Sequence, residues 1–219
     1  VLAASFMESF NRAPVLVSGL PAAQMMSRTG HVVQNPRGCG NSGILMFAGE
    51  LDPSIAQNWY SAYERDFWKD NGWLAGFTEL ARGDTDKLMD VDSGPVIFEF
   101  GSVASVFGIG AANASGRLDH SVPLTMQSVA CSWPTPFGFM VPKIMGLMAV
   151  DSPSLGEVAL LFCMTRPSVV ETVVPYDGNI PGIVWIMLAA YLAVGGMFIG
   201  LEIRGMRRSL KKYHSTVNA

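Results

Sequence analysis

The clearest pattern in the sequence is an uninterrupted apolar run near its C-terminal end. Residues 183–201 read IVWIMLAAYLAVGGMFIGL and contain no charged side chain. An α-helix of this length measures about 28 Å, close to the thickness of the hydrocarbon core of a bilayer. Pro181 and Gly182 precede the run, and Trp185 stands where an aromatic side chain would meet the membrane interface. The pattern therefore predicts one transmembrane helix over residues 183–201.

The other apolar segments are too short or too interrupted to cross a membrane. Residues 96–112 contain Glu99 and several glycines, and the shorter segment 155–164 holds Glu157. We therefore expect them to be core segments of a folded domain. The predicted fold class is α+β. It has one Gly- and Pro-rich extramembrane domain over residues 1–180, the single transmembrane helix, and a basic tail over residues 202–219.

Local patterns within residues 1–180 predict a mixture of short strands and helices. The strongest helix follows Asp52, a capping residue, with Pro53 at the first helical position. The apolar spacings and turn residues predict strands at 14–19, 44–47 and 96–100, helices at 20–28, 52–72, 73–81 and 86–89, and a loop at 35–43.

The helix after Asp52 carries an aromatic and apolar stripe that repeats every four residues. The stripe consists of Ile55, Trp59, Tyr63 and Phe67. One interpretation is a stacking surface for pigment, lipid or a partner protein. The preferred interpretation is that the stripe faces the core of the domain.

Charge is scarce, which bears on how the domain meets its surroundings. Charged residues make up 15% of the chain, against about 25% in an ordinary soluble domain. Residues 93–150 hold only Glu99, Arg117, Asp119 and Lys143 as charged side chains. Because large exposed apolar patches mark interfaces, we expect part of residues 93–165 to be covered by other subunits or by lipid. The net charge of −3 argues against a nucleic-acid partner.

Positive charge is concentrated after the apolar run. The predicted basic anchor on the membrane side consists of Arg204, Arg207, Arg208, Lys211 and Lys212. Lys and Arg near a span favour the cytosol-like side of a membrane, which includes the plastid stroma and the mitochondrial matrix. The sequence therefore predicts a C-terminal tail on that side and the large N-terminal domain on the lumen side.

Small residues recur along one face of the predicted span. Ala189, Ala193, Gly196 and Gly200 follow offsets of 0, 4, 7 and 11, which bring them to one side of an α-helix. Such residues let a second helix or a flat ring approach closely within a membrane. We therefore expect these four residues to form a helix-packing interface. The alternative is that Gly and Ala are simply common in membrane spans.

Residues that could carry chemistry are few, and their spacing matches no catalytic or metal-binding motif. The histidines and cysteines form no Cys-x-x-Cys or His-x-x-x-His pair, so we expect no catalytic residue, no metal site and no intrinsic cofactor. Cys39, Cys131 and Cys163 leave open either one disulfide with a free thiol or three buried thiols. Asn113 begins an Asn-x-Ser acceptor triplet for glycosylation. Glu99 is the one candidate for a membrane-anchored enzyme, and a solvent-facing glutamate is the preferred interpretation.

The chain combines one span, an apolar N-terminal domain and a basic tail. In this layout it resembles the single-span linker subunits that join antenna proteins to photosystems in algal thylakoids. The resemblance implies a non-catalytic structural linker in the plastid thylakoid. Its partners would be antenna proteins, photosystem core proteins and lipid, with chlorophyll or carotenoid contacts only at its edges. The span lacks the paired Glu and Asn or His with Arg that hold chlorophyll in antenna helices.

The same layout is similar to that of a second class of subunit. Supernumerary subunits of mitochondrial respiratory complexes also combine one span with an extramembrane domain, and they would place the chain in the mitochondrial inner membrane. A membrane-anchored enzyme is the third possibility.

Overall fold

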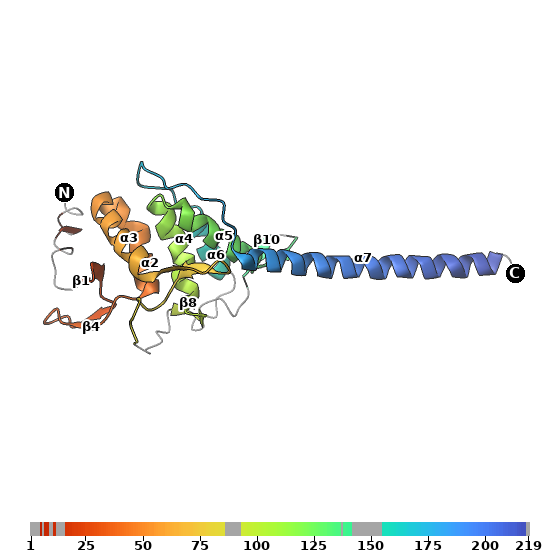
Figure 1. The fold of residues 1–219 in the computed structure, drawn as a ribbon, viewed down its shortest axis with the longest axis horizontal. Helices are drawn as coiled ribbons and strands as arrows, with labels where there is room; N and C mark the ends of the chain where they lie inside the picture. The colour runs from red at the N-terminus through yellow and green to blue at the C-terminus, as the bar shows by residue number, and fades with distance from the viewer. Residues whose placement is uncertain are drawn as a thin grey trace.

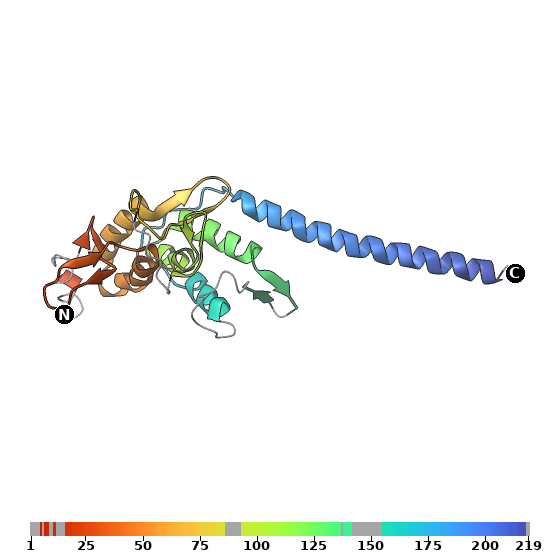
Figure 2. The same cartoon turned by 90° about the horizontal axis from the view of Figure 1, so that it is seen from below.

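The computed structural model describes residues 5, 7–8, 11, 16–85, 93–136, 138–141 and 155–217. Helices and short hairpins pack into a domain, and one long helix projects from the domain to the C-terminal end (Figures 1 and 2). This helix, α7 (Gly182–Val217), follows all the others in the chain. The arrangement confirms a mixed helix and strand fold with one C-terminal helix long and apolar enough to span a membrane.

A helix of small residues, α4 (Ser102–Ala114), lies at the centre of the domain. It packs against α2 (Gly38–Leu51), α5 (Leu118–Ala130) and α6 (Leu155–Met164). Its small side chains permit close approach, because a Cβ added to Gly108 would lie only 2.3 Å from Cδ2 of Phe77. Much of the charge-poor stretch, of which a part was expected to be covered by other subunits or lipid, is therefore core.

Exposed apolar side chains remain elsewhere in this stretch. Most of them lie on the hairpins β7–β8 and β9–β10 and on α6, and include Phe98, Trp133, Phe139, Met140, Val158 and Leu161. The expectation of a covering partner or lipid is thus confined to these positions.

The second long helix of the domain, α3 (Pro53–Phe67), begins as the sequence predicts. The Asp52 carboxylate accepts hydrogen bonds from the backbone N–H groups of Ser54 (3.0 Å) and Ile55 (3.1 Å), which caps the first turn. The helix ends at Phe67, earlier than expected, because Trp68 continues as a strand.

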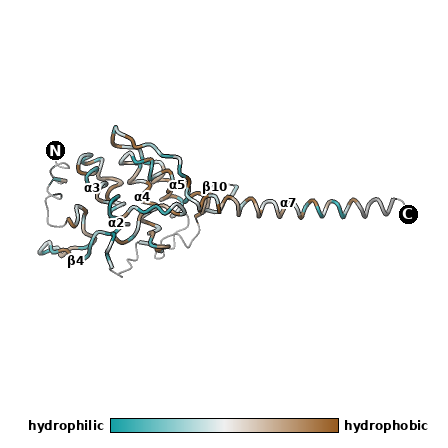
Figure 3. Tube along the Cα trace, in the orientation of Figure 1, coloured by the Kyte–Doolittle hydropathy of each residue, from teal (hydrophilic) through white to brown (hydrophobic). Residues whose placement is uncertain are grey.

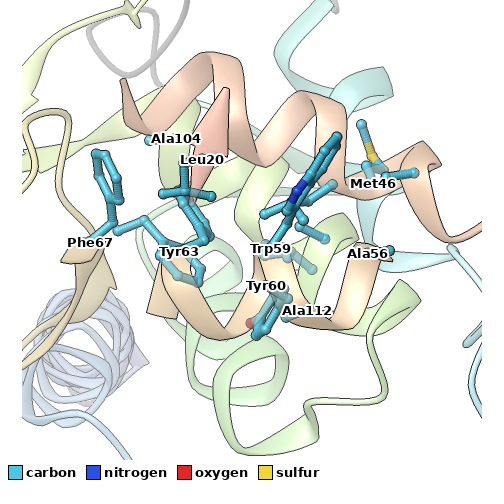
Figure 4. Packing of buried hydrophobic residues seen from close by; sticks show 14 of the residues in the cluster. Leu20, Met46, Ala56, Trp59, Tyr60, Tyr63, Phe67, Ala104 and Ala112 are labelled. Carbon is cyan, nitrogen blue, oxygen red and sulfur yellow. The ribbon is translucent and has the colours of Figure 1, made fainter. Parts of the chain in front are cut away.

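The aromatic stripe of α3 is core. Trp59, Tyr63 and Phe67 are buried, and Ile55 packs against them from a partly buried position (Figure 4). Tyr63 stacks on Phe77 with ring centroids 4.5 Å apart. The preferred interpretation of the stripe is confirmed.

The predicted loop at 35–43 and strand at 44–47 are wrong, because residues 38–51 form one helix, α2. Two backbone N–H groups of its first turn donate to Glu79. Gly38 N–H donates to the backbone carbonyl of Glu79, and Cys39 N–H donates to its carboxylate. Gly38 is required by close packing rather than by a turn, since a Cβ there would lie 2.1 Å from the carbonyl oxygen of Thr78.

The strands that the structure describes pair as five antiparallel two-stranded hairpins. They are β1–β2 (Leu16–Val17, Leu20–Pro21), β3–β4 (Gln24–Met25, Val32–Gln34), β5–β6 (Trp68–Asp70, Ala75–Phe77), β7–β8 (Val96–Ile97, Phe100–Gly101) and β9–β10 (Trp133–Thr135, Gly138–Met140).

Three of the predicted elements are corrected by these hairpins. Residues 20–28 and 73–81 contain strands rather than helices. The predicted strand 96–100 is a hairpin, because Phe98 and Glu99 adopt positive φ angles of 49° and 75° and turn the chain. The strand predicted at 14–19 is present only as β1, and the helix predicted at 86–89 lies outside the described residues.

Candidate functional site

The exposed helix α7 carries the residues that the sequence singles out. Its segment Gly182–Leu210 has a mean hydropathy of 2.1 over its most apolar window, and none of that window is buried within the chain. Figure 3 shows the apolar colouring along the part of α7 nearest the domain and more polar positions beyond it. Among the described residues this is the one helix that meets the length and composition of a membrane span.

The four small residues of the predicted interface have no partner within the described part of the chain. Ala189, Ala193 and Gly196 are exposed, and no atom lies within 4 Å of a Cβ built on Gly196 or Gly200. At 100° per residue these four positions fall within about 60° of one another. They form one continuous strip of small side chains along the helix, which we call the small-residue face.

Contacts with the domain lie on the opposite side of α7. The Tyr191 hydroxyl is 2.6 Å from the carbonyl oxygen of Ser132 and 3.1 Å from that of Ala130, at the end of α5. Tyr191 is two residues past Ala189, a rotation of about 200° around the helix. The small-residue face therefore points away from the domain.

The start of α7 is docked on the turn between β5 and β6. The N–H groups of Gly182 and Ile183 donate to the carbonyl oxygens of Gly72 (2.9 Å) and Trp73 (3.0 Å). A Cβ on Gly182 would lie 2.3 Å from the Trp73 ring, so only glycine allows the indole to pack on this turn. These bonds satisfy N–H groups that would otherwise be orphaned at a helix start.

The predicted basic anchor lies along the far end of α7. Arg204, Arg207 and Arg208 are exposed and share one side of the helix by their spacing of three and four. Lys211 and Lys212 belong to the same helix, in the part whose side chains the structure does not describe. Arginines just beyond an apolar segment are typical of a membrane boundary.

A partly buried ionic network inside the domain was not predicted from the sequence. Arg117 pairs with both oxygens of Glu64, one at 2.6 Å, and with both oxygens of Asp119 at 2.9 and 2.7 Å. His120 lies beside them, with Nε2 3.1 Å from an Arg117 nitrogen and Nδ1 2.9 Å from the Tyr60 hydroxyl. Both protons of Arg117 Nη2 already go to Glu64 Oε1 (2.6 Å) and Asp119 Oδ2 (2.7 Å), so its approach to Nε2 adds no full hydrogen bond. The imidazole is held by the hydrogen bond between Nδ1 and the Tyr60 hydroxyl.

Burial governs the protonation of this network. Burial, reinforced by the adjacent Arg117 cation, lowers the pKa of His120 from 6.5 to about 4, so the ring is neutral at pH 7. Burial likewise raises the pKa of Tyr60 well above its usual value. His120 also stacks on Trp68, with ring centroids 4.0 Å apart. A neutral, fully packed imidazole held between partners serves to join α3 to α5.

The signal for this network was present in the sequence but incomplete. Arg117 and Asp119 are two of the four charged residues in a long apolar stretch, and they lie three positions and one position before His120. Glu64, which closes the network, lies 53 residues away, and no local pattern connects it to Arg117.

The other residues that the sequence offered as candidates are the three cysteines, Glu99 and Asn113. Cys39, Cys131 and Cys163 are free thiols in the structure; Cys163 is buried and the other two are partly buried. Burial raises the pKa of Cys163 to about 11. Glu99 sits in the exposed β7–β8 turn and pairs with Lys69 at the surface. The Asn113 amide donates to the carbonyl oxygen of Cys163 (3.1 Å) and is packed against α6.

Metal ligands do not gather in the part of the chain that the structure covers. Within it, no group of three or more His, Cys, Asp or Glu side chains is placed to hold a metal ion.

Comparison of the chain with protein-family models, with curated proteins and with solved structures finds no match to any of them. The functional argument therefore rests on the geometry of α7 and of the domain attached to it.

Proposed function

We propose that this protein is a non-catalytic accessory subunit of a large membrane complex, held in place by α7. The observation that carries the proposal is the small-residue face, which lies bare on the side of α7 opposite the Tyr191 attachment. A helix in lipid gains association energy from close backbone packing, and Gly and Ala permit such packing. The domain fixes one side of α7 and leaves the other side available to a neighbouring helix.

We further propose that the complex is a photosystem–antenna assembly of the thylakoid, with the chain acting as a linker. The resemblance in layout to single-span linker subunits supports this choice. The charge step across the span supports a lumen-side domain and a stroma-side tail. Chlorophyll or carotenoid would then touch α7 only at its surface, because residues 183–201 contain no His, Asn or Gln to ligate a pigment metal.

Widening the small-residue face tests the proposal. Leucines introduced together by Gly196→Leu and Gly200→Leu would push a neighbouring helix outward and remove the contacts of a close crossing. Individual contacts between membrane helices are modest, and polar ones average about 0.6 kcal/mol. Against contacts of this size, losing the packing along a whole crossing can decide whether the subunit is retained. We expect the double variant to remain in the membrane while much less of it co-purifies with the complex.

The matched control is a second double variant, Val194→Leu with Ile199→Leu. Both positions are exposed on α7, and Val194 and Ile199 lie about 130° and about 90° from the midline of the small-residue face. The control should co-purify like the unaltered chain. Equal retention of the two double variants would overturn the role of the small-residue face.

A further inference from the structure

The end of α5 lies beside the apolar part of α7, and the hairpin β9–β10 continues the chain from there. Tyr191, which binds the end of α5, is nine residues past Gly182, or about 13 Å along the helix axis. Since helical side chains lean toward the N-terminus, its hydroxyl lies about 8–10 Å past the start of the span. Figures 1 and 2 both show the hairpin extending in the same direction as α7, past the first turns of that helix.

The carbonyl groups of the last turn of α5 are hydrogen-bonded. Cys131 N–H, Ser132 N–H and Ser132 Oγ donate to the carbonyl oxygens of Gln127, Val129 and Ser128, respectively, at 2.7–3.1 Å. The single hydroxyl proton of Tyr191 is shared between the carbonyl oxygens of Ser132 (2.6 Å) and Ala130 (3.1 Å). In water such groups can be hydrated, whereas inside a bilayer each unsatisfied group costs several kcal/mol. This capping therefore suits an apolar environment.

The hairpin that follows has the chemistry of a membrane-inserting segment. The sequence Trp133–Met140 contains no charged residue, and Trp133, Phe139 and Met140 are 60%, 55% and 53% exposed. Proline has no N–H group, so Pro134 and Pro136 add no unpaired donor to the hairpin. A two-stranded hairpin alone is marginally stable in water, and burial of its aromatic side chains in lipid would stabilise it.

We propose that the end of α5 and the hairpin β9–β10 insert into the leaflet nearest the domain, in the same bilayer that α7 crosses. The estimated depth of 8–10 Å matches the ~5–10 Å reached by interfacial apolar segments. Trp133 then joins Trp73 and Trp185, which are also exposed and lie near the start of α7, in an aromatic belt. The protein is thereby held in lipid at two places, which fixes the orientation of the domain on the membrane. The inference rests on α7 spanning the bilayer, as the proposed function also does.

Quenching of tryptophan fluorescence by lipid bromine tests the insertion. The full chain is reconstituted into phosphatidylcholine vesicles whose acyl chains carry bromine in their upper half, and into unbrominated vesicles. Subtracting the emission of the Trp133→Phe variant from that of the unaltered chain gives the share of the fluorescence that comes from Trp133. We expect brominated lipid to lower this share of the fluorescence by about twofold or more, as for an aromatic side chain in the interface. Trp185→Phe gives the share of a residue on α7, and Trp59→Phe that of a buried residue, which should be unchanged.

The three shares separate the possible outcomes. Quenching of both Trp133 and Trp185 supports the insertion of the hairpin. Quenching of Trp185 alone overturns the insertion and leaves α7 as a span, in which case a protein partner covers the hairpin. Quenching of neither overturns both the insertion and the span on which the proposed function depends.

Discussion

The buried imidazole of His120 makes the stability of the domain depend on pH above the range in which carboxyl groups titrate. In the folded chain His120 is neutral, with a pKa of about 4, because burial and the neighbouring Arg117 disfavour the imidazolium. In the unfolded chain the pKa returns to about 6.5. Unfolding therefore takes up a proton between these two pH values, and the folded state loses stability as the pH falls from 6.5 toward 4.

The size of this loss follows from the two pKa values. Integrating the proton uptake from about pH 7.5 to about pH 5.0 gives a decrease of about 2 kcal/mol in the free energy of unfolding. This range stays above the usual pKa of Asp and Glu. Protonation of Asp119, whose pKa is lowered by its hydrogen bonds with Arg117 despite opposing burial, therefore contributes little within it.

Urea denaturation of the detergent-solubilised chain at several pH values measures the effect. Near-ultraviolet circular dichroism follows the packing of Trp59 and Trp68 in the core. The variant His120→Gln places a neutral amide in the site and cannot take up a proton, so the decrease of about 2 kcal/mol should disappear even if the variant is less stable at every pH. Identical pH dependence in the two proteins would refute the assignment of a neutral, buried His120.

Two glycines of α2 should respond in opposite directions to replacement by alanine, as measured by urea denaturation at pH 7.5. Gly38→Ala should lower the free energy of unfolding by about 1–3 kcal/mol, because its Cβ would lie 2.1 Å from the backbone oxygen of Thr78. Gly40→Ala should raise it by roughly 0.5–1 kcal/mol, since the site is helical, exposed and open. Equal effects would mean that α2 does not begin against Thr78.

Elements with long or locally complete signals could be predicted from the sequence. The apolar run 183–201 needs no tertiary context to be recognised, and the helix that contains it extends from Gly182 to Val217. The helix α3 combines a capping Asp52, an early proline and a four-residue repeat, which are all local. The small-residue face was likewise visible in the sequence, because its positions depend only on helical geometry.

Elements set by distant residues could not be predicted. The start of α2 depends on Glu79, about forty residues away, which accepts N–H groups of the first turn. The strand β6 is held by Gln127 of α5, whose amide bonds both backbone groups of Ala75 at 2.9 and 2.7 Å. Neither partner follows from hydrophobic periodicity. Glycine-rich composition also misled the prediction for 35–43, because Gly38 serves close packing there.

The most direct test of the proposed function is the mass of the native particle that contains this chain after extraction with a mild detergent. The account predicts a particle many times larger than the 23.6 kDa chain, with the absorption spectrum of chlorophyll and carotenoid. A large particle that is colourless or absorbs as haem would contradict the photosystem assignment and favour a respiratory complex. Migration of the chain as a free monomer would contradict the central claim that it is a subunit of a large membrane complex.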